Sequence, residues 1–249
     1  MKSFLSSIAR RLIPAACLFL VPLAACTAQN DENPAGTPGP DGAVHQRWNF
    51  DTIKGWVYEH QDTASVSQCS LAGGYLIIYT RAFTLDRQKM HTYHSHYTAG
   101  RYAWRTYISP IATGERASIG SWIYSDDHHE LDFEVGPGTA EVRRKYGIRE
   151  GEMAACMTSQ DFPFISEYTA VKPGWHDFAI ELTDVGGKYL ARWSVDGEVK
   201  QTVQLQYGPE VGFRIYCSVE NLNFIGDKQA ENNNYGMWDY VTFDGQVRK

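Results

Sequence analysis

Apolar and polar residues alternate along short segments of this chain, and turn residues separate these segments. Alternation with a period of two places successive side chains on opposite faces of a β-strand. The pattern predicts strands from the stretches GGYLIIYTR, AGRYAWRTYIS, SIGSWIY, ELDFEV, WHDFAIEL, YLARWSVDGEVKQTV, VGFRIYCSV and MWDYVTFD. Within the sixth stretch, the VDG at residues 195–197 is a hairpin-turn signal.

Many short strands without a major helix predict an all-β fold, an antiparallel β-sandwich or jelly roll. No amphipathic stretch is long enough for a major helix, and the best candidate, near residues 150–157, is short. No sequence period recurs along the chain, which argues against a solenoid or a propeller. We therefore expect one β-jelly-roll domain over residues 46–249.

The N-terminal segment has the features of an export signal. Lys2, Arg10 and Arg11 precede an apolar stretch, AACLFLVPLAA, that is too short to span a bilayer as a mature helix. The stretch ends in LAAC at residues 23–26, which resembles the lipobox of a bacterial lipoprotein. This resemblance implies cleavage before Cys26 and acylation of Cys26, which gives firm membrane attachment. The alternative is an ordinary secretory signal with an incidental cysteine.

The chain is accordingly divided into a lipoprotein signal peptide (residues 1–25), a lipidated Cys26 with a flexible Pro- and Gly-rich tether (26–45), and the folded domain (46–249). The expected location is the bacterial cell envelope, with a lipid anchor in the outer membrane. Whether the domain faces the periplasm or the outside is left open.

Charge and cysteine content exclude some classes of partner and site. The net charge of −6 argues against nucleic acid as a partner. With Cys17 removed and Cys26 acylated, the three remaining cysteines permit at most one disulfide, whose pairing the sequence leaves open. No CxxC pair occurs, so a cysteine zinc site is not expected. The histidines of HTYHSH have metal-like spacing, but a polar lining of a cleft is the preferred interpretation.

One strand carries a row of acids. In HHELDFEVG, Glu130, Asp132 and Glu134 share one face, and apolar residues occupy the other. Crowded carboxylates raise one another's pKa, so one acid stays protonated near neutrality while another is ionised. This is the division that acid/base chemistry needs. A solvated strand face and a calcium site are the alternatives, although Ca²⁺ takes six to eight oxygens, which a straight strand supplies poorly.

The acidic motif and its flanks resemble glycoside hydrolase family 16. ELDFE matches the family's E-x-D-x-E signature and lacks the extra residue of laminarinase-like members. In chain order, the flanks YHSHYTAGRYAWRTYIS, SIGSWIYSDDHHELDFEVG, WHDFAIELTD, ARWSVDGEVKQTV and MWDYVTFDG are also similar to family blocks, so the resemblance covers most of residues 48–246. It implies a concanavalin A-like jelly roll and a retaining, endo-acting glycoside hydrolase.

The resemblance also implies roles for the three acids. Glu130 would be the nucleophile, Glu134 the general acid/base and Asp132 their electrostatic helper. β-Glucan is the leading substrate class, with galactan or xyloglucan next. No cofactor is required, no metal ligands are expected, and a structural calcium ion is not predicted.

Sugar rings stack on aromatic side chains, so aromatic residues are the second requirement of a glycan cleft. Trp122, Tyr124, Trp104 and Tyr216 are the candidates for substrate binding, with core packing as the alternative for each and preferred for Trp104. His94 stands where the family often has an arginine, and it joins the substrate-binding candidates. Trp193 and Trp175 are assigned to the core.

Two other functions remain open from the sequence. A lectin-like, glycan-binding lipoprotein on the same fold would keep the acids without cleaving. A polysaccharide lyase on a similar sandwich would use a His/Tyr pair on uronic acids.

Overall fold

The computed structural model describes residues 24–25, 42–62 and 67–248. The signal peptide, apart from residues 24–25, and the acylated Cys26 lie outside the described residues, so the lipid anchor stays a prediction. Within the described part, no helix is both long and apolar enough to cross a membrane.

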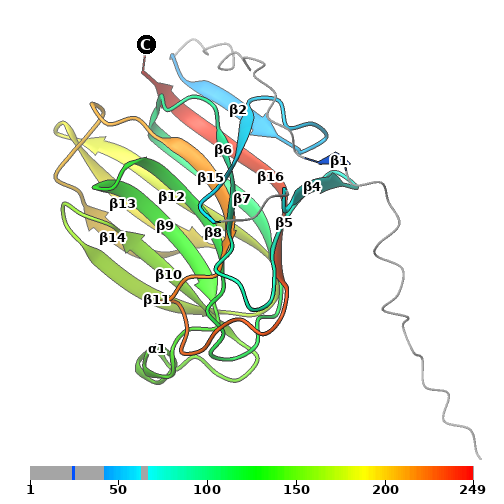
Figure 1. Ribbon diagram of the computed structural model, residues 1–249. Helices are drawn as coiled ribbons and strands as arrows, with labels where there is room; N and C mark the ends of the chain where they lie inside the picture. The colour runs from blue at the N-terminus through cyan, green and yellow to red at the C-terminus, as the bar shows by residue number, and fades with distance from the viewer. Residues whose placement is uncertain (1–23, 26–41, 63–66, 249) are drawn as a thin grey trace, which may run out of the picture.

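The chain forms two antiparallel sheets that make up a sandwich (Figure 1). The first sheet has the strand order β1-β4-β5-β16-β7-β12-β13-β14, with β2 paired to β16. Its strands are β1 (Ala24–Ala25), β2 (Val44–Trp48), β4 (Cys69–Ala72), β5 (Tyr75–Thr80), β7 (Tyr97–Ile108), β12 (Gly174–Val185), β13 (Lys188–Val195), β14 (Glu198–Gln204) and β16 (Asn234–Val247).

The second sheet has the order β11-β10-β9-β8-β15-β6-β3. Its strands are β3 (Trp56–His60), β6 (Arg87–Thr92), β8 (Ser118–Asp126), β9 (His129–Gly136), β10 (Met153–Ser159), β11 (Ile165–Val171) and β15 (Arg214–Glu220). The strand that carries the acids, β9, is thus in the middle of its sheet. The predicted all-β sandwich is confirmed.

All eight predicted stretches form strands, and the sixth forms the β13–β14 hairpin. At its turn Asp196 and Gly197 have φ of 52° and 82°, as a two-residue type I′ loop requires. The best helix candidate, near residues 150–157, forms no helix, because its second half belongs to β10, a short apolar strand whose residues are mostly buried. A short buried strand has no alternation that would distinguish it from a buried helix. The α-helix that forms is α1 (Ala140–Tyr146), capped by Thr139 and Gly147.

The apolar face of β9 is part of the core between the sheets. Leu131, Phe133 and Val135 are at most 1% exposed, and the ring of Phe133 lies 4.9 Å from that of Phe178 on β12. Trp193 of β13 is fully buried, as predicted, and its indole N–H donates to the main-chain oxygen of Asp132 at 3.0 Å. The opposite sheet therefore fixes β9 through packing and through this hydrogen bond.

Trp104 takes the core position that was preferred for it over its candidate role in the cleft, whereas Trp175 is placed differently from the prediction. Trp104, a candidate for the cleft, is fully buried, and its indole N–H donates to the main-chain oxygen of Tyr216 at 3.1 Å. The substrate-binding role of Trp104 is wrong, because its position on β7 points into the core. Trp175 is only partly buried and packs against the rings of Tyr75 and Tyr107, each at 5.4 Å. Its assignment to the core is therefore also wrong.

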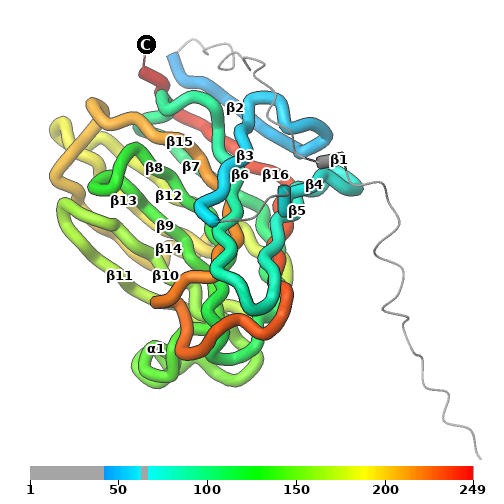
Figure 2. The backbone as a smooth tube through the Cα atoms, viewed as in Figure 1, coloured from blue at the N-terminus to red at the C-terminus, as the bar shows by residue number. Residues whose placement is uncertain are grey.

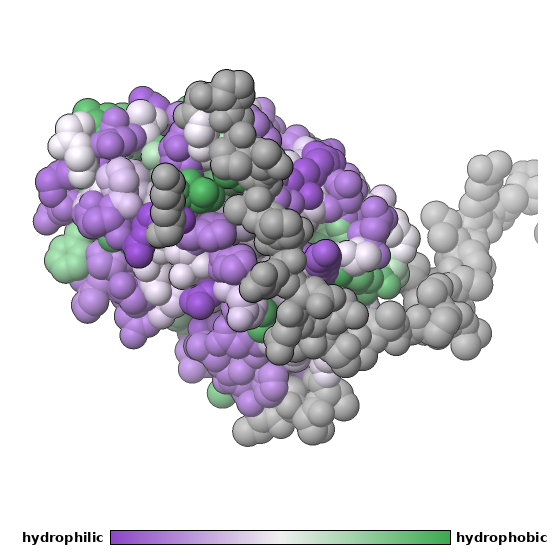
Figure 3. Space-filling view, turned by 90° about the horizontal axis from the view of Figure 1, so that it is seen from above, coloured by the Kyte–Doolittle hydropathy of each residue, from purple (hydrophilic) through white to green (hydrophobic). Residues whose placement is uncertain are grey.

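Helix α1 and the C-terminus lie at opposite ends of the sandwich (Figure 2). The face seen in Figure 3 is mostly hydrophilic where described residues are visible, and apolar residues there form small separate groups. Among the described residues no disulfide is formed, and Cys156 and Cys217 are buried thiols.

Trp104 and Trp175 give a matched test of the core. Trp104→Ala is expected to lower the free energy of unfolding by about 3–5 kcal/mol, because it empties a packed site and removes a buried hydrogen bond. Trp175→Ala should cost about 1–2 kcal/mol, because only part of its ring leaves water on folding. Urea unfolding followed by circular dichroism measures both. Equal losses would contradict the placement of these two side chains.

Candidate active site

A cleft of about 660 Å³ crosses the outer face of the second sheet. Its floor is built from alternate residues of seven neighbouring strands, because every second side chain of each strand points to this face. The residues that line it include Glu59, Gln61, Arg87, Lys89, Trp122, Tyr124, Glu130, Asp132, Glu134, Cys156, Thr158, Ser166, Tyr168, Tyr216 and Glu220. Side chains far apart in the sequence are therefore collected along one face.

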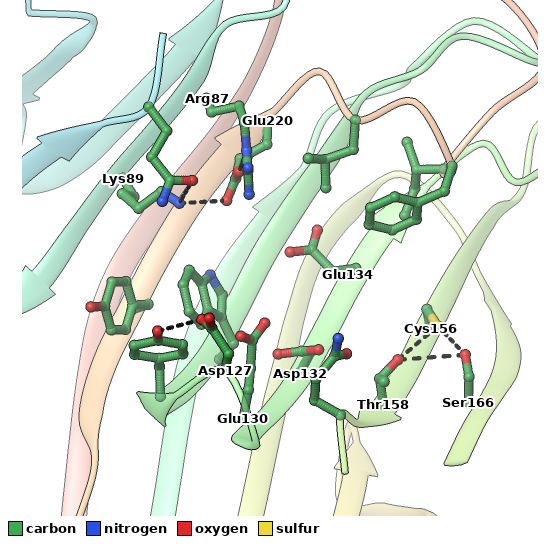
Figure 4. Close-up of a pocket in the computed structure, with 18 of the residues that line it drawn as sticks. Arg87, Lys89, Asp127, Glu130, Asp132, Glu134, Cys156, Thr158, Ser166 and Glu220 are labelled. Atoms are coloured by element: carbon green, nitrogen blue, oxygen red, sulfur yellow. Dashed lines mark hydrogen bonds and ion pairs between the residues drawn. The ribbon is translucent and has the colours of Figure 1, made fainter. Parts of the chain in front are cut away.

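The three acids of β9 lie together on the floor of this cleft. Figure 4 shows Glu130, Asp132 and Glu134 on the same side of their strand, with their carboxyl groups directed into the cleft. In the strand register, Glu134 pairs with Gly120 on β8 and Cys156 on β10. The arrangement that the alternation predicted is thus present, and the row of acids is not a solvated strand face: Asp132 is only 6% exposed.

Burial raises the pKa of all three acids. It raises the pKa of Glu134 to about 8, and neighbouring carboxylates add to this shift. The pKa of Asp132 lies well above its usual range, first because of burial and then because of the charges of Glu130 and Glu134. The pKa of Glu130 is also raised by burial, but a hydrogen bond with Asp132 opposes the shift. Burial and mutual repulsion therefore favour the protonated forms of this row of acids, and the hydrogen bond with Asp132 opposes this for Glu130.

Gly120 makes room for the carboxyl group of Glu134. A Cβ atom at residue 120 would lie 2.8 Å from Oε1 of Glu134 and 2.3 Å from Oγ of Ser218. Any larger side chain at this position would displace the side chain of Glu134 or that of Ser218. Among the described residues, neither Oε2 of Glu134 nor Oδ1 of Asp132 has a hydrogen-bond partner, although both atoms are buried. Buried polar atoms without a partner are costly and mark places where a ligand can bind.

Three of the predicted substrate-binding aromatics line the cleft beside the acids. Trp122 and Tyr216 stack with their ring centroids 3.9 Å apart, and Tyr124 meets both rings edge-on. The indole N–H of Trp122 donates to Oγ of Ser218 at 2.9 Å. Trp122 is only 6% exposed and stacks on Tyr216, so little of its ring surface is open to the cleft.

His94 does not line the cleft. Strand β6 ends at Thr92, and the segment that follows turns away, where the imidazole of His94 stacks on that of His96 at 4.9 Å. The substrate-binding prediction for His94 is therefore wrong. His91, which is still on β6, takes the place beside the cleft aromatics and packs on Tyr216 at 4.8 Å. In the described residues, no group of three or more His, Cys, Asp or Glu side chains has an arrangement that could hold a metal ion.

The sequence interpretation missed the charged side of the cleft. Arg87 and Lys89 on β6 both form ion pairs with Glu220 on β15, at 2.5 Å and 3.3 Å. The alternation of β15 could have shown Glu220, since it follows Tyr216 and Ser218 on the same face. Arg87 and Lys89 were missed because β6 was not predicted as a strand. Two exposed rings at the cleft, Phe164 and Phe224, lie in loops without any periodic signal.

Comparison with known proteins gives structural matches alone. No protein-family model matches the chain, and the search of curated proteins finds no relative. Among solved structures, the Bacillus licheniformis β-glucanase is 12% identical, with a TM-score of 0.54, covering 80% of this chain and 97% of that one. The endo-1,3-β-glucanase from Streptomyces sioyaensis is 16% identical, with a TM-score of 0.59, covering 86% and 100%. The Crh5 transglycosylase in complex with NAG is 16% identical, with a TM-score of 0.59, covering 85% and 86%.

The fold is the jelly roll of these glucanases. The resemblance found in the sequence is thereby confirmed at the level of architecture. At identities of 12% to 16% the agreement extends to the fold, and the chemistry has to be argued from the residues of this jelly roll.

The raised pKa of Glu134 makes the stability of the jelly roll depend on pH. The folded state keeps this proton up to about pH 8, while the unfolded state releases it near 4.5, so stability falls as the pH rises through this window. Glu134→Gln removes this titration. We expect the variant to exceed the parent in stability at pH 8 by on the order of 2 kcal/mol, and by much less at pH 5.

Denaturant unfolding at the two pH values measures this difference. The exposed Glu150 supplies the control, since Glu150→Gln should change stability little at either pH. A gain for Glu134→Gln that is the same at pH 5 and pH 8 would contradict a raised pKa.

Proposed function

We propose that this jelly roll is a glycoside hydrolase that cleaves internal β-glycosidic bonds of a β-glucan with retention of configuration. The observation that carries the proposal is the row of three carboxyls on the floor of the cleft, whose pKa values burial raises. The glucanase fold supports the same chemistry, and because the similar structures include β-glucanases, β-glucan is the first substrate to test.

In the proposed first step, a carboxylate oxygen of Glu130 attacks the anomeric carbon and the bond to the leaving oxygen breaks. Glu134 gives its proton to that oxygen, and a glycosyl ester forms on Glu130. In the second step, Glu134 takes a proton from water, the water oxygen attacks the anomeric carbon, and the ester bond to Glu130 breaks. Both carboxyls return to their starting states.

Asp132 suits the helper role because it hydrogen-bonds to Glu130. A protonated Asp132 that donates to Glu130 favours the ionised nucleophile and can release it as the ester forms. The main-chain oxygen of Asp132 is itself bound by Trp193, so the middle of the row is fixed from the core. Glu134, with its pKa of about 8, is protonated at neutral pH, as a general acid must be.

A lectin-like glycan-binding protein is the second candidate. The small exposed area of Trp122 and Tyr216 argues against it. Stacked on each other, these two rings leave little surface open to a sugar. Cleavage of a neutral β-glucan, seen as released reducing ends, supports the hydrolase. Binding without cleavage supports the lectin, and an unsaturated product from uronic acid polymers would support a lyase. Acylation at Cys26 and location in the cell envelope stay predictions from the sequence.

Substitutions of Glu130 and of Glu134 should impair catalysis in different ways. Glu130→Gln is expected to lower turnover by several orders of magnitude on every substrate, because no glycosyl ester can form. Glu134→Ala should retain activity on an aryl glycoside with a good leaving group, whose oxygen needs little protonation. Added azide should then accelerate Glu134→Ala and give a glycosyl azide of β configuration, which reports retention.

Kinetics on a natural β-glucan and on an aryl glycoside, with product analysis by NMR, measure both effects. Glu150→Gln is again the control. Equal and modest losses in Glu130→Gln and Glu134→Ala would show that these carboxyls do not perform the chemistry.

The exposed ring of Phe164 gives a test of the cleft as the glycan-binding site. Phe164 lines the cleft and is 65% exposed, whereas Phe83 is 66% exposed and lies outside the cleft lining. Phe164→Ala is expected to weaken glycan binding by about 1–2 kcal/mol through lost stacking, with little change in stability. Phe83→Ala should leave binding unchanged. Calorimetric titration of a Glu130→Gln background with an oligosaccharide measures the affinities, and equal affinities for the two variants would place the glycan elsewhere.

A further inference from the structure

We propose that the ion cluster formed by Glu220, Lys89 and Arg87 controls whether Glu134 keeps its proton. The cluster would thereby set the pH above which Glu134 can no longer protonate the leaving oxygen. This inference rests on the proposed function, to which the acid step belongs. The effect of Glu220 and Lys89 on the proton of Glu134 does not depend on that function. Glu220 would keep the proton on Glu134, and Lys89 would limit that effect.

Two members of the cluster, Glu220 and Lys89, are buried in the cleft floor, whereas the side chain of Arg87 is 40% exposed. The side chains of Glu220 and Lys89 are 2% and 3% exposed, and Lys89 Nζ lies 3.3 Å from Oε1 of Glu220. Arg87 Nε lies 2.5 Å from Oε2 of the same carboxylate. Lys89 Nζ also donates to Oε1 of Gln61 at 3.2 Å. Removing such charges from water costs several kcal/mol per ion, so a buried ion pair of this kind is weak evidence for a purely stabilising role.

The register brings this cluster close to Glu134. Lys89 pairs with Ser218, Ser218 with Gly120, and Gly120 with Glu134, so Lys89 and Glu134 lie in one row across the sheet. Glu220 lies two residues along β15 from Ser218, on the same face. Gly120 has no side chain, and Figure 4 shows the carboxyl group of Glu134 directed across the strands toward Glu220. No large side chain from the intervening row separates the two carboxyl groups.

Other titratable groups line the cleft together with Glu134. A test has to separate their effects on Glu134 from those of Glu220 and Lys89. Two lie on the same strand as Glu134, two on β8 and in the turn after it, two on the far side of the cleft on β10 and β11, and the rest on β3, β6 and β15. They are Glu130, Asp132, Tyr124, Asp127, Cys156, Tyr168, Glu59, Arg87, Lys89, Tyr216 and Glu220. After burial, the charge of Glu220 is the largest cause that raises the pKa of Glu134, and the charge of Lys89 acts in the opposite direction.

Because Glu220 and Lys89 carry opposite charges, substituting each of them separately gives the sharpest test of the inference. Glu220→Gln removes the repulsion and leaves two cations facing Glu134, so the pKa of Glu134 should fall by about one unit or more. Lys89→Met keeps the length of the side chain and leaves the carboxylate of Glu220 with Arg87 alone. The pKa of Glu134 should then rise. A merely structural role for the cluster would not move the pKa in opposite directions.

Two readouts follow the pKa. The first is the alkaline limb of the pH–rate profile on β-glucan, which should move down for Glu220→Gln and up for Lys89→Met. On an aryl glycoside with a good leaving group the limb should respond much less, because little protonation is needed. The second is a carbon-13 NMR titration of the Glu134 carboxyl group, assigned by its loss in Glu134→Gln, which needs no activity.

The double variant Glu220→Gln, Lys89→Met removes one charge of each sign and should lie between the two single variants, which protects the test if Glu220→Gln fails to fold. Glu150→Gln is the distant control. A carboxyl titration that is unchanged in both single variants, or shifted in the same direction, overturns the inference. If the wild-type chain cleaves no glycan, the proposed function fails, while the NMR titration still decides whether Glu220 and Lys89 control the proton of Glu134.

Discussion

The packing of one face of β9 against the opposite sheet is the constraint on which the site depends. Leu131, Phe133 and Val135 are buried in the core, and each such side chain is worth roughly 1.5–3 kcal/mol when removed from water. A shift of the strand by one residue would exchange its faces, bury three carboxyls and expose the apolar residues. The core therefore fixes the direction of the acids, and the indole of Trp193 fixes the position of the middle one.

The same arrangement places ionisable groups where the fold gains little from them. Glu134 and Asp132 each have a buried oxygen without a partner among the described residues, and burial raises the pKa of both groups. A structure selected for stability alone would place amides or apolar residues there. Groups that are unfavourable for folding but poised for proton transfer are typical of catalytic sites. This contrast is the physical reason for assigning chemistry to this face of the sheet.

The two sides of the cleft also differ in charge. On the side of β6 and β15 it contains the ion pairs of the buried Glu220, whereas on the side of β10 and β11 it contains Cys156, Thr158 and Ser166, which hydrogen-bond to one another. Glu134 lies between the charged side and the neutral side (Figure 4). The charges of Glu220 and Lys89 act on the acid from one side, which is why substitutions on β6 and β15 are expected to shift its pKa.

The sequence by itself determined the sandwich, the β13–β14 hairpin and the direction of the acids. Period-two alternation along ELDFEV and the turn residues at Asp196 and Gly197 are local signals that depend on no distant contact. The sequence did not reveal β10, because a short strand buried within the sheet carries no alternation.

Only the tertiary structure decided which aromatic and charged residues meet the acids. Trp104 and Trp122 look alike in the sequence, yet one points into the core and the other borders the cleft. Strand order brings Lys89 and Glu220 to within ion-pair distance, although 131 residues separate them along the chain. Such contacts depend on how strands pair across the sheet, and the pairing is set by the packing of the whole core rather than by any one segment.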